Sequence, residues 1–185
     1  VYKRQVLEGL FGPVYQSTTT SKLIENKQLA DFKIKCLVLK YPDDVCKLSR
    51  SWDYQAEIDY IVTNRYRNEF IRNLVISLEG NSLVLFSLVE KHGKQIYKLI
   101  EEKADNRHVF FVYGGTEVEV REQVRAITEK ENNAIIVASY GTFSTGINIR
   151  NLHNVIFASP SKSRVRNLQS IGRGLRIGDN KTEAV

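Results

Sequence analysis

The pattern of hydrophobic and polar positions along this 185-residue chain changes near residue 80. After that point, short apolar runs alternate with segments whose apolar residues recur every three or four positions, the period of a helix. The pattern predicts strands at 83–87, 108–114, 134–139 and 154–159, and helices at 91–103, 117–131 and 163–176. Strands that alternate with helices of this length predict right-handed crossovers and a parallel sheet with helices on both faces.

Residues 1–80 follow a different pattern. A short helix is expected at 22–30, capped by Thr20 or Ser21, and an alternating, half-buried strand at 31–41. Two helices are predicted at 54–62 and 65–78, and Gly80 is expected to end the second. One face of that second helix carries Phe70, Leu74 and Leu78. We therefore expect a linker segment at 1–80 and an α/β domain at 81–185.

The cysteines and the apolar runs exclude several classes of protein. Cys36 lies in the alternating stretch and is expected to be a buried strand residue, and neither it nor Cys46 has partners at metal-ligand spacing. We therefore expect no metal site. The longest apolar runs, at 82–89 and 134–138, are shorter than the ~20 residues that cross a bilayer. With no secretory signal pattern at the first residues, we expect a cytoplasmic protein without a membrane partner.

Positive charge is concentrated towards the end of the chain. The sequence has 27 basic and 21 acidic residues, yet residues 139–181 contain seven basic residues against Asp179 alone. A concentrated basic surface suits phosphate ligands, either a nucleotide or a nucleic-acid backbone. The alternative is a solvated cationic helix.

The stretch QSIGRGLR at 169–176 is the most specific motif. A helix would place its amide, its first glycine and its two arginines on one face. A glycine inside a helix costs about 1 kcal/mol relative to alanine, so close approach of another domain or a phosphate would explain it. The stretch resembles motif VI of superfamily 2 helicases. That resemblance implies nucleotide contacts from Gln169 and Gly172 and catalytic guanidinium groups at Arg173 and Arg176. The alternative is a basic amphipathic helix with a chance glycine.

The stretch ASYGTFSTGINI at 138–149 follows a predicted strand and is expected to form a turn. Its small hydroxyl residues and its backbone N–H groups can meet phosphate oxygens. The stretch resembles motif V of the same family, which implies nucleotide contacts from Gly146 and from Asn148, an asparagine where aspartate is commoner. The implied contacts with the nucleic-acid backbone come from Ser139, Thr142, Ser144 and Thr145. The alternative is a plain loop.

The stretch at 82–100 resembles motif IV, a buried strand followed by a polar turn and a helix. The resemblance implies nucleic-acid contacts from Ser87 and His92, and from Gly114 after the next strand. A purely structural histidine is the alternative for His92.

These stretches occur in the order of superfamily 2 helicases, and residues 138–159 are most similar to the UvsW-type phage recombination helicases. The resemblance implies the second RecA-like domain of an ATP-dependent DNA helicase or translocase in recombination, repair or branch migration. Its DNA would be single-stranded or branched, and its compartment the host cytoplasm if the protein is phage-encoded. Residues 1–80 resemble the passage from a first RecA-like domain into the second.

The sequence contains no GxxxxGK[ST] phosphate loop and no DEAD- or DEAH-like acidic pair. ATP and Mg²⁺ are therefore expected to be held mainly by a first RecA-like domain that this sequence lacks, and the chain alone is predicted not to hydrolyse ATP. Both ends read as truncated. The alternatives are a non-catalytic nucleic-acid-binding α/β domain and a doubly wound small-molecule enzyme, although a GxGxxG motif is missing.

Overall fold

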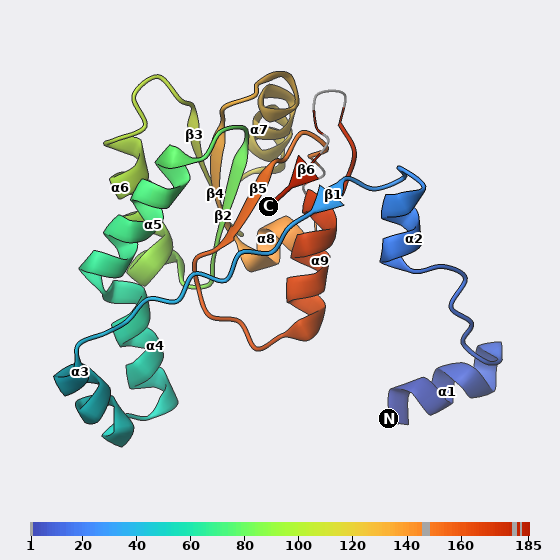
Figure 1. Cartoon of the computed structure of the whole chain (residues 1–185), viewed down its shortest axis with the longest axis horizontal. Helices are drawn as coiled ribbons and strands as arrows, with labels where there is room; N and C mark the ends of the chain where they lie inside the picture. Colours follow the sequence, from blue (N-terminus) through green and yellow to red (C-terminus); the bar gives the residue numbers. More distant parts are fainter. Residues whose placement is uncertain (1, 146–148, 179–180, 182) are drawn as a thin grey trace.

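A computed structural model describes residues 2–145, 149–178, 181 and 183–185, and the side chains of all of these except 2, 3, 144 and 145. Its main sheet has four parallel strands in the order β3-β4-β2-β5 (Figure 1). The strands are β2 (Ser82–Phe86), β3 (Val109–Val112), β4 (Ile135–Ser139) and β5 (Asn154–Phe157). All four predicted strands of the α/β part are confirmed.

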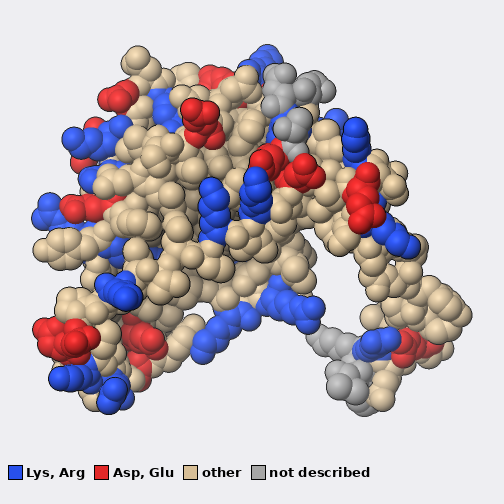
Figure 2. Space-filling view, in the orientation of Figure 1, with Lys and Arg blue, Asp and Glu red and all other residues tan. Residues whose placement is uncertain are grey.

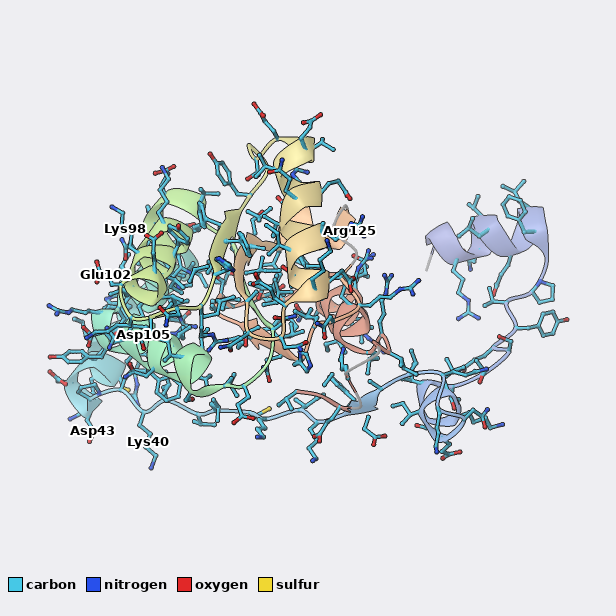
Figure 3. All side chains as sticks on the ribbon, turned by 90° about the horizontal axis from the view of Figure 1, so that it is seen from above. Lys40, Asp43, Lys98, Glu102, Asp105 and Arg125 are labelled. Carbon is cyan, nitrogen blue, oxygen red and sulfur yellow. The ribbon has the colours of Figure 1, made fainter. Side chains whose placement is uncertain are left out.

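Helices cover both faces of this sheet. Seen from above (Figure 3), α6 with Lys98, and Glu102 just beyond its end, lie on one side and α7 with Arg125 on the other. One core cluster joins the strands to α7 and α8, and a second joins them to α5 and α6. The bounds are α5 (Arg65–Ser77), α6 (Lys94–Glu101), α7 (Val118–Lys130) and α8 (Tyr140–Thr145). The predicted α/β fold with a parallel sheet between helices is confirmed.

The central strand β2 is buried along its whole length. Strands with neighbours on both edges and helices on both faces read as continuous apolar runs. The register pairs Phe86 with Ser139 of β4, and Leu85 with Phe157 of β5. The carboxyl ends of β2, β4 and β5 are therefore level, and the residues that follow them meet at one edge of the sheet, where open α/β sheets bind ligands.

Before the sheet, the chain forms α1 (Tyr2–Phe11), α2 (Thr20–Glu25), α3 (Asp43–Leu48), the 3₁₀ turn η1 (Ser49–Ser51) and α4 (Tyr54–Thr63). The two helices predicted at 54–62 and 65–78 are confirmed as α4 and α5. The cap of α2 is Thr19, whose hydroxyl accepts from the Lys22 N–H, and not Thr20 or Ser21. Ile71 and Val75 of α5 pack into the sheet's core, while the boundary near residue 80 stays a prediction.

The strand predicted at 31–41 is much shorter in the structure. Only β1 (Asp31–Phe32) forms, paired in parallel with β6 (Glu183–Ala184). Cys36 is exposed and lies outside any strand, so its predicted burial is wrong. The physical reason is that residues 34–41 have no neighbouring strand in the described part of the chain. Their apolar side chains instead line an open groove against α5 and β5, together with Phe70 and Leu74.

The last two elements are the π-helical turn η2 (Val89–Gly93), which leads into α6, and α9 (Arg164–Gly174). Among the described residues, no helix has the length and apolar character needed to cross a membrane.

Candidate functional site

Ser159, just after β5, links the carboxyl ends of three strands. Its Oγ accepts a hydrogen bond from the Ser87 N–H at 3.0 Å and lies 2.8 Å from His92 Nδ1. Its carbonyl oxygen accepts a hydrogen bond from the Tyr140 hydroxyl at 2.8 Å. Ser87 is exposed at this edge and Ser139 is half-buried. The structure therefore brings the predicted residues Ser87, His92 and Ser139 together at one edge of the sheet.

His92 does not lie on the surface of this edge. It is 0% exposed, because η2 places its ring against Ser159 inside the protein. Burial, and then the positive charge of Arg67, lower the pKa of His92 to about 4, so the ring is neutral near pH 7. A direct contact between His92 and DNA does not fit this placement, whereas a positioning role through Ser159 does.

Gly93 explains why η2 can pack so closely. A Cβ at this position would lie 2.5 Å from a ring carbon of Phe86 at the end of β2. The glycine therefore lets the turn sit directly on the strand, which buries the neighbouring histidine. The sequence showed the glycine, but its contact with the strand end could not be seen from the pattern.

Residues 140–145 form the short helix α8 and not the predicted turn. Tyr140 and Phe143 occupy one side of it and are both buried in the core, which favours a helix. The Ser139 hydroxyl accepts from the Thr142 N–H at 3.4 Å and lies 2.8 Å from the Thr142 hydroxyl. Thr142 is 5% exposed, so its hydroxyl supports the start of α8 more than it faces a ligand.

Gly114 lies on an exposed turn after β3, with nothing near the position of an added Cβ. The turn is held by Arg121 of α7, whose guanidinium donates to the carbonyl oxygens of Thr116 and Gly114 at 2.9 and 3.1 Å. The predicted residues Gly146 and Asn148 lie outside the described residues, as do the side chains of Ser144 and Thr145.

Helix α9 begins after Ser163, whose hydroxyl accepts from the Arg166 N–H at 3.3 Å. Gln169 and Gly172 are exposed on it, and a Cβ at Gly172 would meet nothing within 4 Å. Gly174 is different, because a Cβ there would lie 3.1 Å from a methyl carbon of Val155 in β5. Gly174 therefore lets α9 approach the sheet, whereas Gly172 leaves open space on the outer side of the helix.

Arg176 was predicted on the same helical face as Arg173, but α9 ends at Gly174 and Arg176 lies beyond it. Their charges nevertheless interact. Burial lowers the pKa of the Arg176 guanidinium, and the positive charges of Arg173 and Arg150 lower it further, while the Glu129 carboxylate opposes them. Glu129 also accepts a hydrogen bond from the Arg150 N–H at 2.6 Å. These three arginines, the arginine cluster, gather at the C-terminal end of α9.

Lys181 anchors this end of the helix from inside. It is 2% exposed, and its ammonium donates to the carbonyl oxygens of Gly174 and Arg176, the second at 3.0 Å. Burial lowers the pKa of Lys181 to about 8. The ammonium thus occupies two carbonyl groups at the helix end and fixes the backbone that carries Arg176.

The arginine cluster fits a polyphosphate better than it fits a metal ion. Guanidinium groups bind phosphate oxygens in a planar fork and stay charged. Mg²⁺ needs carboxylate or phosphate oxygens, and the acidic group named beside the cluster, Glu129, already accepts from Arg150. Within the described part of the chain, no group of three acidic, histidine or cysteine side chains could hold a metal ion. The arginine cluster can therefore bind the phosphate groups of a nucleotide.

Several positioning residues were missed in the sequence. The Arg67 guanidinium donates to the Ala158 carbonyl oxygen at 2.6 Å, which ties α5 to the end of β5. The Asn81 side chain bonds to backbone groups of Thr128, Glu131, Ala134 and Asn151. Such residues form no local pattern, because their partners lie far away in the sequence.

Comparison with known proteins finds relatives in both sequence and structure. The chain is 41% identical over 179 residues to the ATP-dependent DNA helicase uvsW of Enterobacteria phage T4, which covers 95% of this chain and 35% of that protein. The crystal structure of T4 UvsW superposes with a TM-score of 0.64 at 40% identity, over 73% of this chain and 27% of that one. The chain thus spans about a third of the length of its curated relative.

A second solved structure shows the same fold at lower identity. The ATP-dependent Type ISP restriction-modification enzyme LlaBIII bound to DNA superposes with a TM-score of 0.63 at 20% identity, over 96% of this chain and 13% of that one. The model of the helicase conserved C-terminal domain matches residues 66–178, which include η2, the edge of the sheet and the arginine cluster. The chain belongs to the helicase conserved C-terminal domain family.

Proposed function

We propose that this chain is the second motor domain of an ATP-dependent DNA helicase or translocase that acts in recombination, repair or branch migration. In this proposal, Arg173 and Arg176 complete an ATP site whose phosphate loop belongs to a first RecA-like domain of the same protein. The T4 relative is an ATP-dependent DNA helicase, which supports the assignment. If the protein is phage-encoded, its place of action is the host cytoplasm.

The observation that carries this proposal is the arginine cluster beside an open helix surface. Arg173 and Arg176 lie together at the end of α9, and Gly172 leaves room on the outer face for another domain. Lys181 and Glu129 hold the backbone on either side. Positive groups held in fixed positions can stabilise charge without reorganising during the reaction.

Bound ATP would supply the phosphoryl group whose transfer to water drives the motor. The first domain would hold most of the nucleotide and its Mg²⁺. Arg173 and Arg176 would neutralise the charge that develops on the γ-phosphoryl oxygens in the transition state. Gln169 and Gly172, exposed on the same helix, would contact the nucleotide, as would Gly146 and Asn148, which are proposed from the sequence alone.

The proposed DNA backbone contacts are at the carboxyl edge of the sheet. Ser87 and Gly114 are exposed there and Ser139 is half-buried. For Ser144 and Thr145 the proposal rests on the sequence. His92 and Thr142 would act indirectly, by holding Ser159 and the start of α8.

The test compares this chain alone with the same chain joined to a P-loop domain. The chain alone should show no DNA-stimulated ATP hydrolysis, and any DNA affinity should fall steeply with salt because phosphate contacts release counterions. The joined protein should hydrolyse ATP, faster with DNA. Turnover above background by a clean preparation of the chain alone would contradict the division of the ATP site between two domains.

A non-catalytic nucleic-acid-binding domain is the second candidate. The observation that favours it is the gathering of Lys and Arg side chains over the loop before α9 and its first turn (Figure 2). A joined protein that binds DNA but does not depend on Arg173 or Arg176 for hydrolysis would support this candidate.

A further inference from the structure

A cleft of about 220 Å³ lies between α4 and the loop that leads from β5 into α9. Tyr54, Lys162 and Arg166 are among its lining residues, as is Ser87, which follows β2 at the sheet edge. Tyr54 precedes the residues matched by the helicase C-terminal domain, 66–178. The cleft therefore joins the domain to the segment before it, and none of the proposed ATP contacts belongs to it.

The two cations of this cleft keep their charge available. Lys162 Nζ lies 4.4 Å from the centroid of the Tyr54 ring, and the Arg166 guanidinium carbon lies 5.7 Å from the centroid of the Tyr140 ring. In the part of the chain that the structure describes, neither side chain forms an ion pair with a carboxylate. Aromatic rings orient a cation without neutralising it, so both remain able to bind an anion.

Hydroxyl groups accompany these charges. The Ser161 hydroxyl is buried and has no hydrogen-bond partner among the described atoms. Ser87 is exposed, and its N–H is already used by Ser159. Hydroxyl groups beside Lys and Arg are the usual donors to the phosphates of nucleic acids.

Several contacts hold α4, which carries Tyr54, against its neighbours. Asp59 of α4 forms an ion pair with Lys91 of η2 at 2.6 Å, which ties the helix to the turn after β2. Tyr60, on the same helix, contacts the ring of Trp52 at a centroid distance of 5.0 Å. The Asp53 carboxylate, the acidic group nearest in sequence to Tyr54, accepts from the Ala56 N–H as the helix cap. A preformed site loses less conformational entropy on binding.

We propose that this cleft binds the phosphate backbone of a single nucleic-acid strand through Lys162 and Arg166. The inference rests on the proposed function, because a strand that follows the carboxyl edge of the sheet reaches the cleft through Ser87. The proposed cleft gives that strand an additional contact surface. Part of this surface is α4, which lies outside the residues matched by the helicase domain.

The test measures the affinity of the protein that joins this chain to a P-loop domain for an oligo-dT strand, without ATP, at several salt concentrations. Arg166→Ala and Lys162→Ala should each lower the slope of log affinity against log salt by about 0.7, the value for one phosphate contact with a single strand. The double variant should weaken binding roughly tenfold at physiological salt. Thermal melting would verify that these exposed substitutions leave the fold intact.

Arg164→Ala is the matched control. Arg164 is exposed on the same helix, carries the same charge and does not line the cleft, so its slope should change much less. Equal slopes for Arg164→Ala and Arg166→Ala, or an unchanged slope in the double variant, would overturn the proposal. Because ATP is absent, failure of the ATP-site proposal would leave this result standing, and the reverse also holds.

Discussion

The two ends of α9 carry arginines in opposite surroundings. At the N-terminal end, Arg166 and Lys162 lie against aromatic rings and face an open cleft. At the C-terminal end, about 10 Å further along the helix, Arg173 and Arg176 lie together beside Glu129 and above the buried Lys181. A ligand with many phosphates spaced along a strand suits the first arrangement, and a compact polyphosphate suits the second.

This difference teaches that charge alone does not assign a role. In the sequence, the basic residues at 139–181 form a single excess of positive charge. In the structure, Lys162 and Arg166 face the open cleft, whereas Arg173 and Arg176 belong to the arginine cluster. The arginine cluster is held by backbone contacts that a binding surface does not need. Substitutions at the two ends should therefore affect different quantities.

The largest effect is expected at the C-terminal end. In the protein that joins this chain to a P-loop domain, Arg173→Ala or Arg176→Ala should lower kcat by roughly 10³-fold, the range for an arginine that stabilises the transition state. Arg173→Lys should recover little, because an ammonium cannot reproduce the planar fork. Steady-state ATP hydrolysis at saturating DNA measures the change.

The next largest effect is a pH dependence of the free energy of unfolding, which comes from His92 in the turn η2. The pKa of His92 is about 4 in the folded chain, below its ordinary 6.5, so the unfolded chain binds a proton between these values and the folded chain does not. The contribution to stability is present above pH 6.5 and is lost as pH falls, by about 3 kcal/mol at pH 4. Urea unfolding at pH 4 to 7 measures it.

Other groups also titrate between pH 4 and 7, so the contribution of His92 has to be isolated with a variant and a matched control. His92→Gln should remove this part of the pH dependence, whereas His108→Gln should keep it, because His108 is exposed and pairs with Glu131 at the surface. Identical pH dependence in both variants would show that His92 is not the group responsible.

A smaller effect is expected from the anchor of the arginine cluster. Lys181→Met keeps the aliphatic stem but leaves the carbonyl oxygens of Gly174 and Arg176 without their donor. We expect a loss of about 1–3 kcal/mol in the free energy of unfolding at pH 7. Lys98→Met, at an exposed position on α6, should change stability little. Chemical denaturation measures the free energy of unfolding of both variants. Equal values for the two would contradict the anchoring role of Lys181.

The smallest effect distinguishes the two glycines of α9. Gly172→Ala meets open space and should stabilise the chain by up to about 1 kcal/mol through helix propensity, while Gly174→Ala should lose a similar amount because Val155 must move. In the joined protein, Gly172→Ala should still lower ATP hydrolysis, since another domain closes on that face. Unchanged hydrolysis would place the interdomain contact elsewhere.

Much of the fold could be predicted from the sequence because it depends on local periodicity. The four strands of the sheet, α4 to α7 and the start of α9 all follow apolar patterns that are complete within each element. The strand at 31–41 was overestimated because alternation does not guarantee a partner strand. Residues 140–145 were read as a turn because Gly, Ser and Thr outweighed Tyr140 and Phe143, whose spacing favours the helix that forms.

The site was predicted less completely, since its geometry depends on contacts between distant residues. The motifs located Arg173 and Arg176, but the end of α9 at Gly174 and the anchor from Lys181 could not be read from spacing. His92 was considered as a nucleic-acid contact because its stretch resembles motif IV, with a purely structural histidine as the alternative. His92 is buried because Gly93 packs on Phe86, and this contact appears only in three dimensions.

The most direct measurement of the central claim records kcat for ATP and affinity for single-stranded DNA on the same preparations of Arg176→Ala and Arg164→Ala. Arg164 is exposed near the other end of α9, so its variant should retain most of its hydrolysis. The account predicts that Arg176→Ala loses roughly 10³-fold in kcat while its DNA affinity stays within a few-fold. Normal hydrolysis by Arg176→Ala, with a salt-sensitive loss of DNA binding, would contradict the account and make the arginine cluster a nucleic-acid contact.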